Sequence, residues 1–102
     1  MPGFLVKKSI QIEFLNLNCN KLKRLLKIHF DFVKYIEQFY LSNNQIDFIE
    51  YPSLSKIVNL MRLDLSKNFL KNLHEKTFHQ LFKLSYLNLS SNYLTFIDKD
   101  LF

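Results

Sequence analysis

The sequence predicts an α/β solenoid, in which equivalent coils stack with a parallel β-sheet on one face and irregular or short helical segments on the other. One apolar pattern starts four times at an unbroken spacing of 24 residues, most clearly as LMRLDLSKNFLKNL from Leu60 and LSYLNLSSNYLTFI from Leu84. Each copy also holds an asparagine at the same place. A fixed period in this range is the signature of a repeat architecture.

The first part of each repeat predicts a β-strand, because inward apolar residues alternate there with outward residues. Strands of successive coils are expected to pair in parallel, about 4.8 Å apart. The inward columns are Ile12, Ile36, Leu60 and Leu84, then Leu15, Phe39, Leu63 and Leu87, then Leu17, Leu41, Leu65 and Leu89.

An asparagine follows each strand, where the chain has to turn out of the sheet. An asparagine amide can donate two hydrogen bonds and accept two. Stacked once per coil, it can satisfy backbone groups that the turn would otherwise bury without partners. This column consists of Asn20, Asn44, Asn68 and Asn92.

The rest of each coil is expected to return along a convex side as irregular chain with short helical or 3₁₀ turns. Apolar residues of this return segment are expected to point inward. Their columns are Leu22, Ile46, Leu70 and Leu94, then Leu25, Ile49, Leu73 and Ile97, then Phe30, Leu54, Phe78 and Phe102, with Val33, Ile57 and Leu81 as the last.

The pattern LxxLxLxxNxLxxLxxxxFxxL over residues 12–102 resembles the leucine-rich repeat, in the typical 24-residue subclass of extracellular proteins and Toll-like receptor ectodomains. The second copy departs from the pattern at Phe39 and Leu54. The resemblance implies a leucine-rich repeat arc with its sheet on the concave face.

The repeat boundaries follow from the same alignment. Four repeats are expected to start at residues 12, 36, 60 and 84, after a partial coil over residues 1–11. The fourth repeat is expected to be truncated at Phe102. We therefore expect a fragment of a longer solenoid, which could also self-associate through its uncapped C-terminal end.

Outward residues of the predicted strands are the candidates for partner binding, because a leucine-rich solenoid leaves its concave face open. Tyrosine and arginine are enriched among residues that dominate interface energies. Aromatic residues also favour strands for their own sake, so a purely structural role is the alternative. The candidates are Phe14, Asn16, Gln38, Tyr40, Arg62, Asp64, Tyr86 and Asn88.

Positive charge is concentrated in the first third of the chain, and the whole sequence has a formal net charge of +5. A basic patch of Lys21, Lys23, Arg24 and Lys27 follows the first asparagine of the asparagine column. It is either a solvated flank or a docking site for an acidic partner, a glycan or a phosphate. Nucleic acid is not expected, since these residues are not interleaved with aromatic residues on the sheet face.

Catalytic, metal-binding and cofactor-binding patterns are absent from the sequence. The three histidines, His29, His74 and His79, do not recur with cysteines or carboxylates at metal-ligand spacing. A single glycine cannot build a glycine-rich phosphate loop. We therefore expect a binding protein and not an enzyme, with no metal and no cofactor.

The cellular compartment is left open by the sequence. No apolar run approaches the roughly 20 residues of a membrane-spanning helix, and no signal peptide is recognisable. The sequon Asn88-Leu89-Ser90 is a weak indication of N-glycosylation and so of secretion. The repeats favour an extracellular or cell-surface protein, and a cytoplasmic location is the alternative.

The leading hypothesis is a protein-protein interaction segment, of receptor type or extracellular, that binds its ligand through the concave sheet face. The alternatives are spacer repeats with a structural role, or an intracellular scaffold without a ligand of its own.

Overall fold

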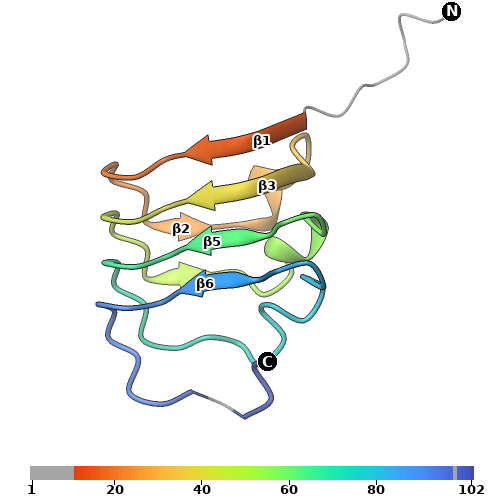
Figure 1. Ribbon diagram of the computed structural model, residues 1–102. Coiled ribbons are helices and arrows are strands. Elements are labelled where there is room, and N and C mark those ends of the chain that lie inside the picture. Colours follow the sequence, from red (N-terminus) through yellow and green to blue (C-terminus); the bar gives the residue numbers. More distant parts are fainter. Residues whose placement is uncertain (1–10, 98) are drawn as a thin grey trace, which may run out of the picture.

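The computed structural model describes residues 11–97 and 99–102, which form a stack of coils with a parallel sheet on one side (Figure 1). The four-stranded sheet has the order β1-β3-β5-β6. Its strands are β1 (Gln11–Asn16), β3 (Tyr35–Tyr40), β5 (Arg62–Asp64) and β6 (Tyr86–Asn88). For description, residues 12–35, 36–59, 60–83 and 84–102 are called coils one to four.

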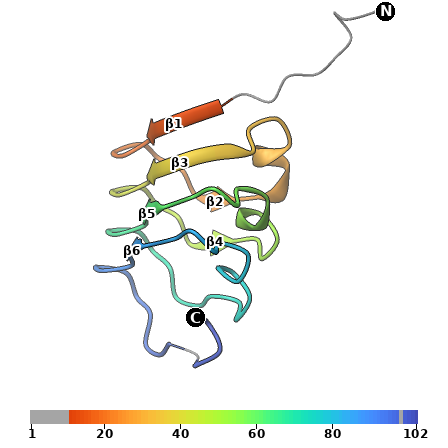
Figure 2. The same cartoon turned by 45° about the vertical axis from the view of Figure 1, so that its right-hand side comes forward.

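The return side of the stack has less regular structure. It contains a two-stranded parallel sheet and two short 3₁₀ helices, which lie behind the main sheet in Figures 1 and 2. These elements are β2 (Arg24–Leu25), β4 (Phe48–Ile49), η2 (Lys27–Phe30) and η3 (Leu54–Lys56). The predicted fold class, an α/β solenoid with short helical turns on its convex side, is confirmed.

The register of the main sheet is constant from strand to strand. Each residue pairs with the residue 24 positions further on, as in the series Phe14, Gln38, Arg62 and Tyr86. A slip by one residue would turn the apolar side chains to the outer face. The apolar columns of the sequence therefore hold the strands in register.

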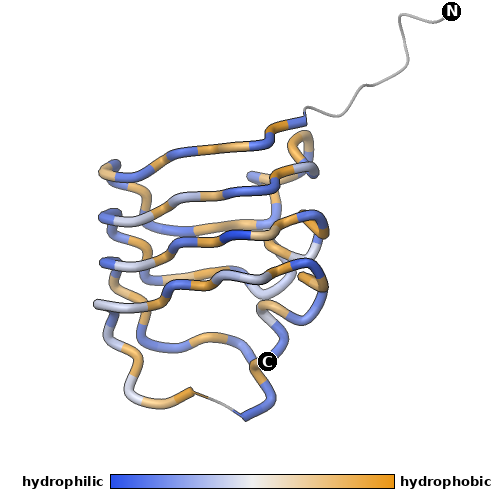
Figure 3. Tube along the Cα trace, viewed as in Figure 1, coloured by the Kyte–Doolittle hydropathy of each residue, from blue (hydrophilic) through white to orange (hydrophobic). Residues whose placement is uncertain are grey.

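The core lies between the main sheet and the return segments. Its central members are fully or almost fully buried, and they include Ile36, Phe39, Leu41, Leu60, Leu63 and Leu65. Leu15 and Leu87, in the first and last coils, are only partly buried. Figure 3 shows hydrophobic and hydrophilic positions alternating along the stacked strands, which is the pattern that creates this core.

A ladder of asparagine side chains ties the coils together beside the core. Asn68 accepts a bond at Oδ1 from the Ile46 amide (3.0 Å) and donates from Nδ2 to the carbonyls of Leu41 (2.9 Å) and Leu65 (3.1 Å). Asn44 and Asn92 repeat this arrangement. The asparagine column thus satisfies backbone groups of two successive coils, as its hydrogen-bonding capacity predicts.

The residue before each ladder asparagine has a left-handed backbone conformation. These residues are Cys19, Asn43, Lys67 and Ser91, with φ between 55° and 60°. Such a conformation costs a residue with a Cβ atom roughly 1–2 kcal/mol. It is tolerated here because the ladder and the strand pairing on either side over-determine the turn.

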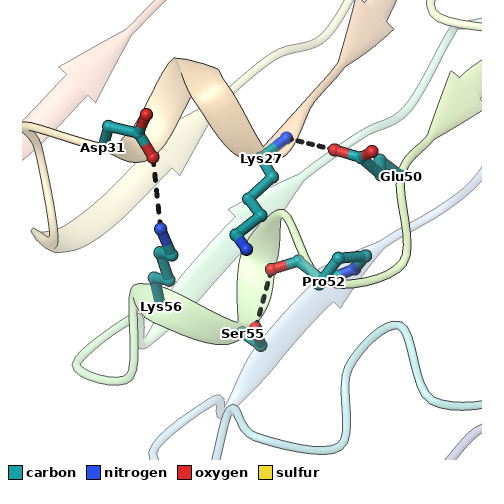
Figure 4. A network of polar contacts seen from close by, with 6 residues as sticks. All are labelled: Lys27, Asp31, Glu50, Pro52, Ser55 and Lys56. Atoms are coloured by element: carbon teal, nitrogen blue, oxygen red, sulfur yellow. Dashed lines mark hydrogen bonds and ion pairs between the residues drawn. The ribbon is translucent and has the colours of Figure 1, made fainter.

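Polar contacts on the convex side join coils one and two (Figure 4). The Lys27 amide donates to Glu50 Oε1 (2.6 Å), and Lys56 Nζ lies 3.2 Å from Asp31 Oδ1. Ser55 Oγ donates to the Pro52 carbonyl within the turn that leads into η3. The first two contacts connect the return segments of coils one and two at the surface.

Breaking the ion pair between Lys56 and Asp31 should change stability little, because both side chains are partly exposed. We expect Lys56→Ala to lower the free energy of unfolding by less than about 1 kcal/mol. Urea denaturation at low and high salt would measure this. A loss well above that value would mean that the pair is shielded from solvent in solution.

The last coil differs from the expected columns of inward residues at two positions, Ile97 and Phe102, and Ile97 is 49% exposed. Phe102 is 74% exposed and stacks on Phe78, with ring centroids 6.0 Å apart, whereas Leu101 is 2% exposed. The expectation that Ile97 and Phe102 point inward is therefore wrong. No described coil packs below Phe102, so the smaller Leu101 fills the end of the core and Phe102 lies outside it.

The predicted boundaries of the repeats stay a prediction. Of the partial coil expected over residues 1–11, only Gln11 lies within the described residues, where it pairs with Tyr35.

Candidate functional site

Two rows of side chains run across the concave face, perpendicular to the strands. Register pairing places Phe14, Gln38, Arg62 and Tyr86 in one row. It places Asn16, Tyr40, Asp64 and Asn88 in the adjacent row. The structure thus brings together all eight residues proposed for partner binding, while their role in binding stays a prediction.

Aromatic, cation-π and hydrogen-bond contacts organise the first row and join it to Tyr40 of the second. The Arg62 guanidinium lies over the Tyr86 ring, 4.1 Å from its centroid. The Phe14 and Tyr40 rings are 5.0 Å apart, and Tyr40 Oη donates to Gln38 Oε1 (2.9 Å). These contacts restrict several large side chains before any partner arrives.

Arg62 keeps its hydrogen-bonding capacity available. It is exposed, and within the described part of the chain it makes neither an ion pair with Asp64 nor a hydrogen bond with Gln38. A guanidinium carries five N–H donors in a planar fork. Because no described residue accepts a hydrogen bond from Arg62, these donors are available to a carboxylate or a carbonyl of a partner.

Asp64 and Asn88 form hydrogen bonds that stabilise the turns at the ends of their strands. Asp64 Oδ1 accepts from the amide (2.9 Å) and the hydroxyl (2.6 Å) of Ser66. Asn88 Oδ1 accepts from the same two groups of Ser90 (3.0 and 2.7 Å). One oxygen of each side chain is therefore committed to the turn.

Acidic residues lie near the start of the first two concave strands, Glu13 in β1 and Glu37 in β3. Tyr35 Oη donates to Glu37 Oε2 (2.8 Å), and this hydrogen bond raises the pKa of the Tyr35 phenol. Partial desolvation and the charges of Glu37 and Glu13 act in the same direction. Acidic residues therefore lie near the start of β1 and β3, and Arg62 lies in β5.

The basic patch lies on another surface. Lys21, Lys23, Arg24 and Lys27 are all exposed on the return side, and none of them forms an ion pair with a residue that the structure describes. Arg24 belongs to β2 and pairs in register with Phe48 of β4. The patch and the concave rows are thus separate candidates for binding.

A groove beside the basic patch was not found by reading the sequence. Its lining residues come from the return segments of coils two, three and four, and its volume is about 1130 Å³. They are Asp47, Phe48, Ile49, Tyr51, Phe69, Lys71, Asn72, Leu73, His74 and Tyr93. The residue after the ladder asparagine is polar in the first two coils, Lys21 and Gln45, and aromatic in the next two, Phe69 and Tyr93. This change from polar to aromatic residues at one repeat position is the sequence signal that could have revealed the groove.

Three further properties bear on the kind of protein. In the described ranges, no set of three or more His, Cys, Asp or Glu side chains is placed to hold a metal ion. Nor does any described helix have the length and hydrophobicity needed to cross a membrane. Cys19 is exposed and unpaired with another cysteine.

The stacked coils, the asparagine ladder and the open parallel sheet define a leucine-rich repeat solenoid. Comparison with known proteins agrees: residues 58–102 match the family model described as leucine rich repeat. The chain is therefore a leucine-rich repeat protein, and such proteins are typically non-enzymatic interaction modules.

Individual relatives are similar over most of this chain. Podocan of Mus musculus is 34% identical over 97 residues, which is 93% of this chain and 15% of podocan. The structure of TLR13 in complex with ssRNA13 superposes with a TM-score of 0.76 at 35% identity, covering 84% of this chain and 12% of that one. The chain thus spans a small part of each relative's length.

Proposed function

We propose that this chain binds a protein ligand through the concave face of its sheet, as a segment of a receptor-type or extracellular protein. The observation that carries the proposal is the pair of ordered side-chain rows across β1, β3, β5 and β6, with Arg62 stacked on Tyr86. The similarity to podocan and to TLR13 supports an interaction role.

Preorganisation is the mechanism of this binding. Ordering a flexible side chain on association costs about 0.5–1.5 kcal/mol. Here the sheet fixes the spacing of the rows, and ring contacts already restrict Phe14, Tyr40, Arg62 and Tyr86. A partner therefore meets an aromatic surface with one free guanidinium edge, a combination that is common at interface hot spots.

Arg62→Ala and Tyr40→Ala should each weaken binding of the protein ligand by about 1–3 kcal/mol, roughly a 5- to 150-fold rise in Kd. Probing a cell-displayed library of extracellular protein domains with the full chain would supply ligands. Surface plasmon resonance would then compare Kd values for the wild type and the variants. Phe82→Ala is the matched control, because Phe82 is an exposed aromatic outside both rows.

Two outcomes would contradict the proposal. One is a set of ligands whose Kd is unchanged by both concave variants. The other is an equal loss with Phe82→Ala, which would indicate non-specific apolar adhesion. If no ligand binds the wild type, the alternative role as spacer repeats gains support.

A further inference from the structure

We infer that the return side of the stack carries a second interaction surface, which binds an extended acidic segment of a partner protein. The surface consists of the basic patch and the adjacent aromatic groove. This inference goes beyond the concave-face function and does not depend on it, since the two surfaces share no residue.

The groove exists because the return segments of successive coils separate. Between coils one and two, the amides of Gln45, Asp47 and Glu50 donate to the carbonyls of Leu22, Lys23 and Leu25 at 2.8–3.1 Å. Between coils two and three, the Phe69 amide donates to the Ile46 carbonyl (2.8 Å), and no backbone bond joins the described residues 71–74 to 47–50. Figures 1 and 2 both show the return segment of coil three diverging from β4.

This separation leaves β4 with an open edge. β4 pairs with β2 on one side and has no strand partner on the other among the described residues. An exposed strand edge presents backbone donors and acceptors that an extended peptide can pair with. The groove therefore suits a partner segment in an extended conformation.

The lining of the groove is apolar and aromatic. Ile49 and Leu73 are buried or half-buried below it, and Phe48, Phe69 and Tyr93 are exposed along its sides. The Phe69 and Tyr93 rings lie 5.9 Å apart, and Tyr51 stacks on His74 with centroids 4.4 Å apart. Large exposed apolar groups that gather in one groove mark a binding site more often than scattered ones do.

Charge complementarity selects an acidic occupant. Arg24 lies directly beside Phe48 in the paired strands β2 and β4, and the Lys23 carbonyl accepts a bond from the Asp47 amide. The four cations of the patch lie within seven residues, and none is neutralised by an ion pair with a described residue. A row of free cations next to an apolar groove favours an anionic segment that also carries an apolar side chain.

A peptide fits these features better than other polyanions. A single-stranded nucleic acid fits less well, because the cations lie beside the aromatic residues instead of alternating with them, unlike in typical single-strand sites. A glycan would leave the apolar floor at Ile49 and Leu73 without a matching group. A phenylalanine or leucine side chain would fill that floor.

The test uses fluorescence anisotropy with the full chain and a labelled peptide of about twelve residues, in which phenylalanine and leucine stand between runs of aspartate and glutamate. We expect saturable binding that weakens with salt. A peptide with serines in place of the two apolar residues should bind roughly tenfold or more weakly. A version with lysines in place of the acids should not bind.

Variants of the chain locate the site. The pair Lys23→Gln and Arg24→Gln should weaken binding about tenfold, and Phe69→Ser should do the same. Lys76→Gln with Lys99→Gln is the control for charge, and Phe82→Ser is the control for an exposed aromatic. Circular dichroism of each variant checks that the fold is retained, and Tyr40→Ala should leave peptide binding unchanged.

Several results would overturn the inference. If the serine-substituted peptide binds equally well, the apolar groove does not take part in binding. If the charge-control variant loses as much affinity as the basic-patch variant, binding depends only on the net charge of the chain. Tighter binding of a heparin oligosaccharide or of an oligothymidylate would show that the surface prefers another polyanion. A failure of this test leaves the concave-face proposal intact, because Tyr40→Ala and Arg62→Ala probe that site separately.

Discussion

Asn68→Ala is expected to lower the free energy of unfolding by about 4 kcal/mol. The side chain is 1% exposed and makes four hydrogen bonds, to the Ile46 amide and to the carbonyls of Leu41, Leu65 and Ser66. Alanine would leave the Ile46 amide and the carbonyls buried without this partner, and each unsatisfied group costs about 1–3 kcal/mol. Urea denaturation followed by circular dichroism would measure the change.

Asn20→Ala is the matched control at the exposed end of the same ladder. Asn20 donates to the carbonyls of Leu17 (2.9 Å) and Asn18 (3.2 Å) within its own coil, and its Oδ1 accepts no bond from the described residues. Water can replace these contacts, so we expect a loss below about 1 kcal/mol. Similar losses for the two variants would contradict the conclusion that bonds between buried coils give the ladder its importance.

The sequence was sufficient to predict the strand pairing because the repeat encodes it directly. A spacing of 24 residues between apolar columns is also the register offset between paired strands, as between Leu15, Phe39 and Leu63. The position of the ladder asparagine follows from the chemistry of a turn beside a core. Where the stack ends, this reasoning fails, because Phe102 has no described coil to pack against and Leu101 takes its place in the core.

The candidate sites were predictable to different degrees. Alternation along the strands places Arg62 and Tyr86 on the concave face, but their stacking depends on rotamers that the sequence does not specify. The groove near Phe69 depends on how far the return segments separate. That separation is a property of irregular chain, where neither the period of two nor the hydrogen-bond ladder constrains the backbone.

Phe39→Ala is expected to lower the free energy of unfolding by about 3–5 kcal/mol, because it removes a large buried ring from the core. Phe39 is 2% exposed and pairs in register with Leu15 and Leu63 of the neighbouring coils. Its ring also meets Phe30 edge-on, with centroids 6.1 Å apart. Phe82→Ala, at a position that is 82% exposed, should change stability by no more than about 0.5 kcal/mol.

How the loss of stability caused by Phe39→Ala is distributed along the stack distinguishes a solenoid from a globular domain. In a solenoid each coil contacts only its neighbours, so stability is approximately a sum of coil and interface terms. A cavity at Phe39 in β3 weakens the packing of coil two against coils one and three, because β3 pairs with β1 and β5. The strand of coil four, β6, pairs with β5 and not with β3. Hydrogen exchange should therefore show the largest loss of protection in the amides of β1 and β3 and the smallest in β6. A uniform loss across all four strands would mean that the chain unfolds as one cooperative unit, and the ladder of hydrogen bonds through Asn44, Asn68 and Asn92 would be the physical reason.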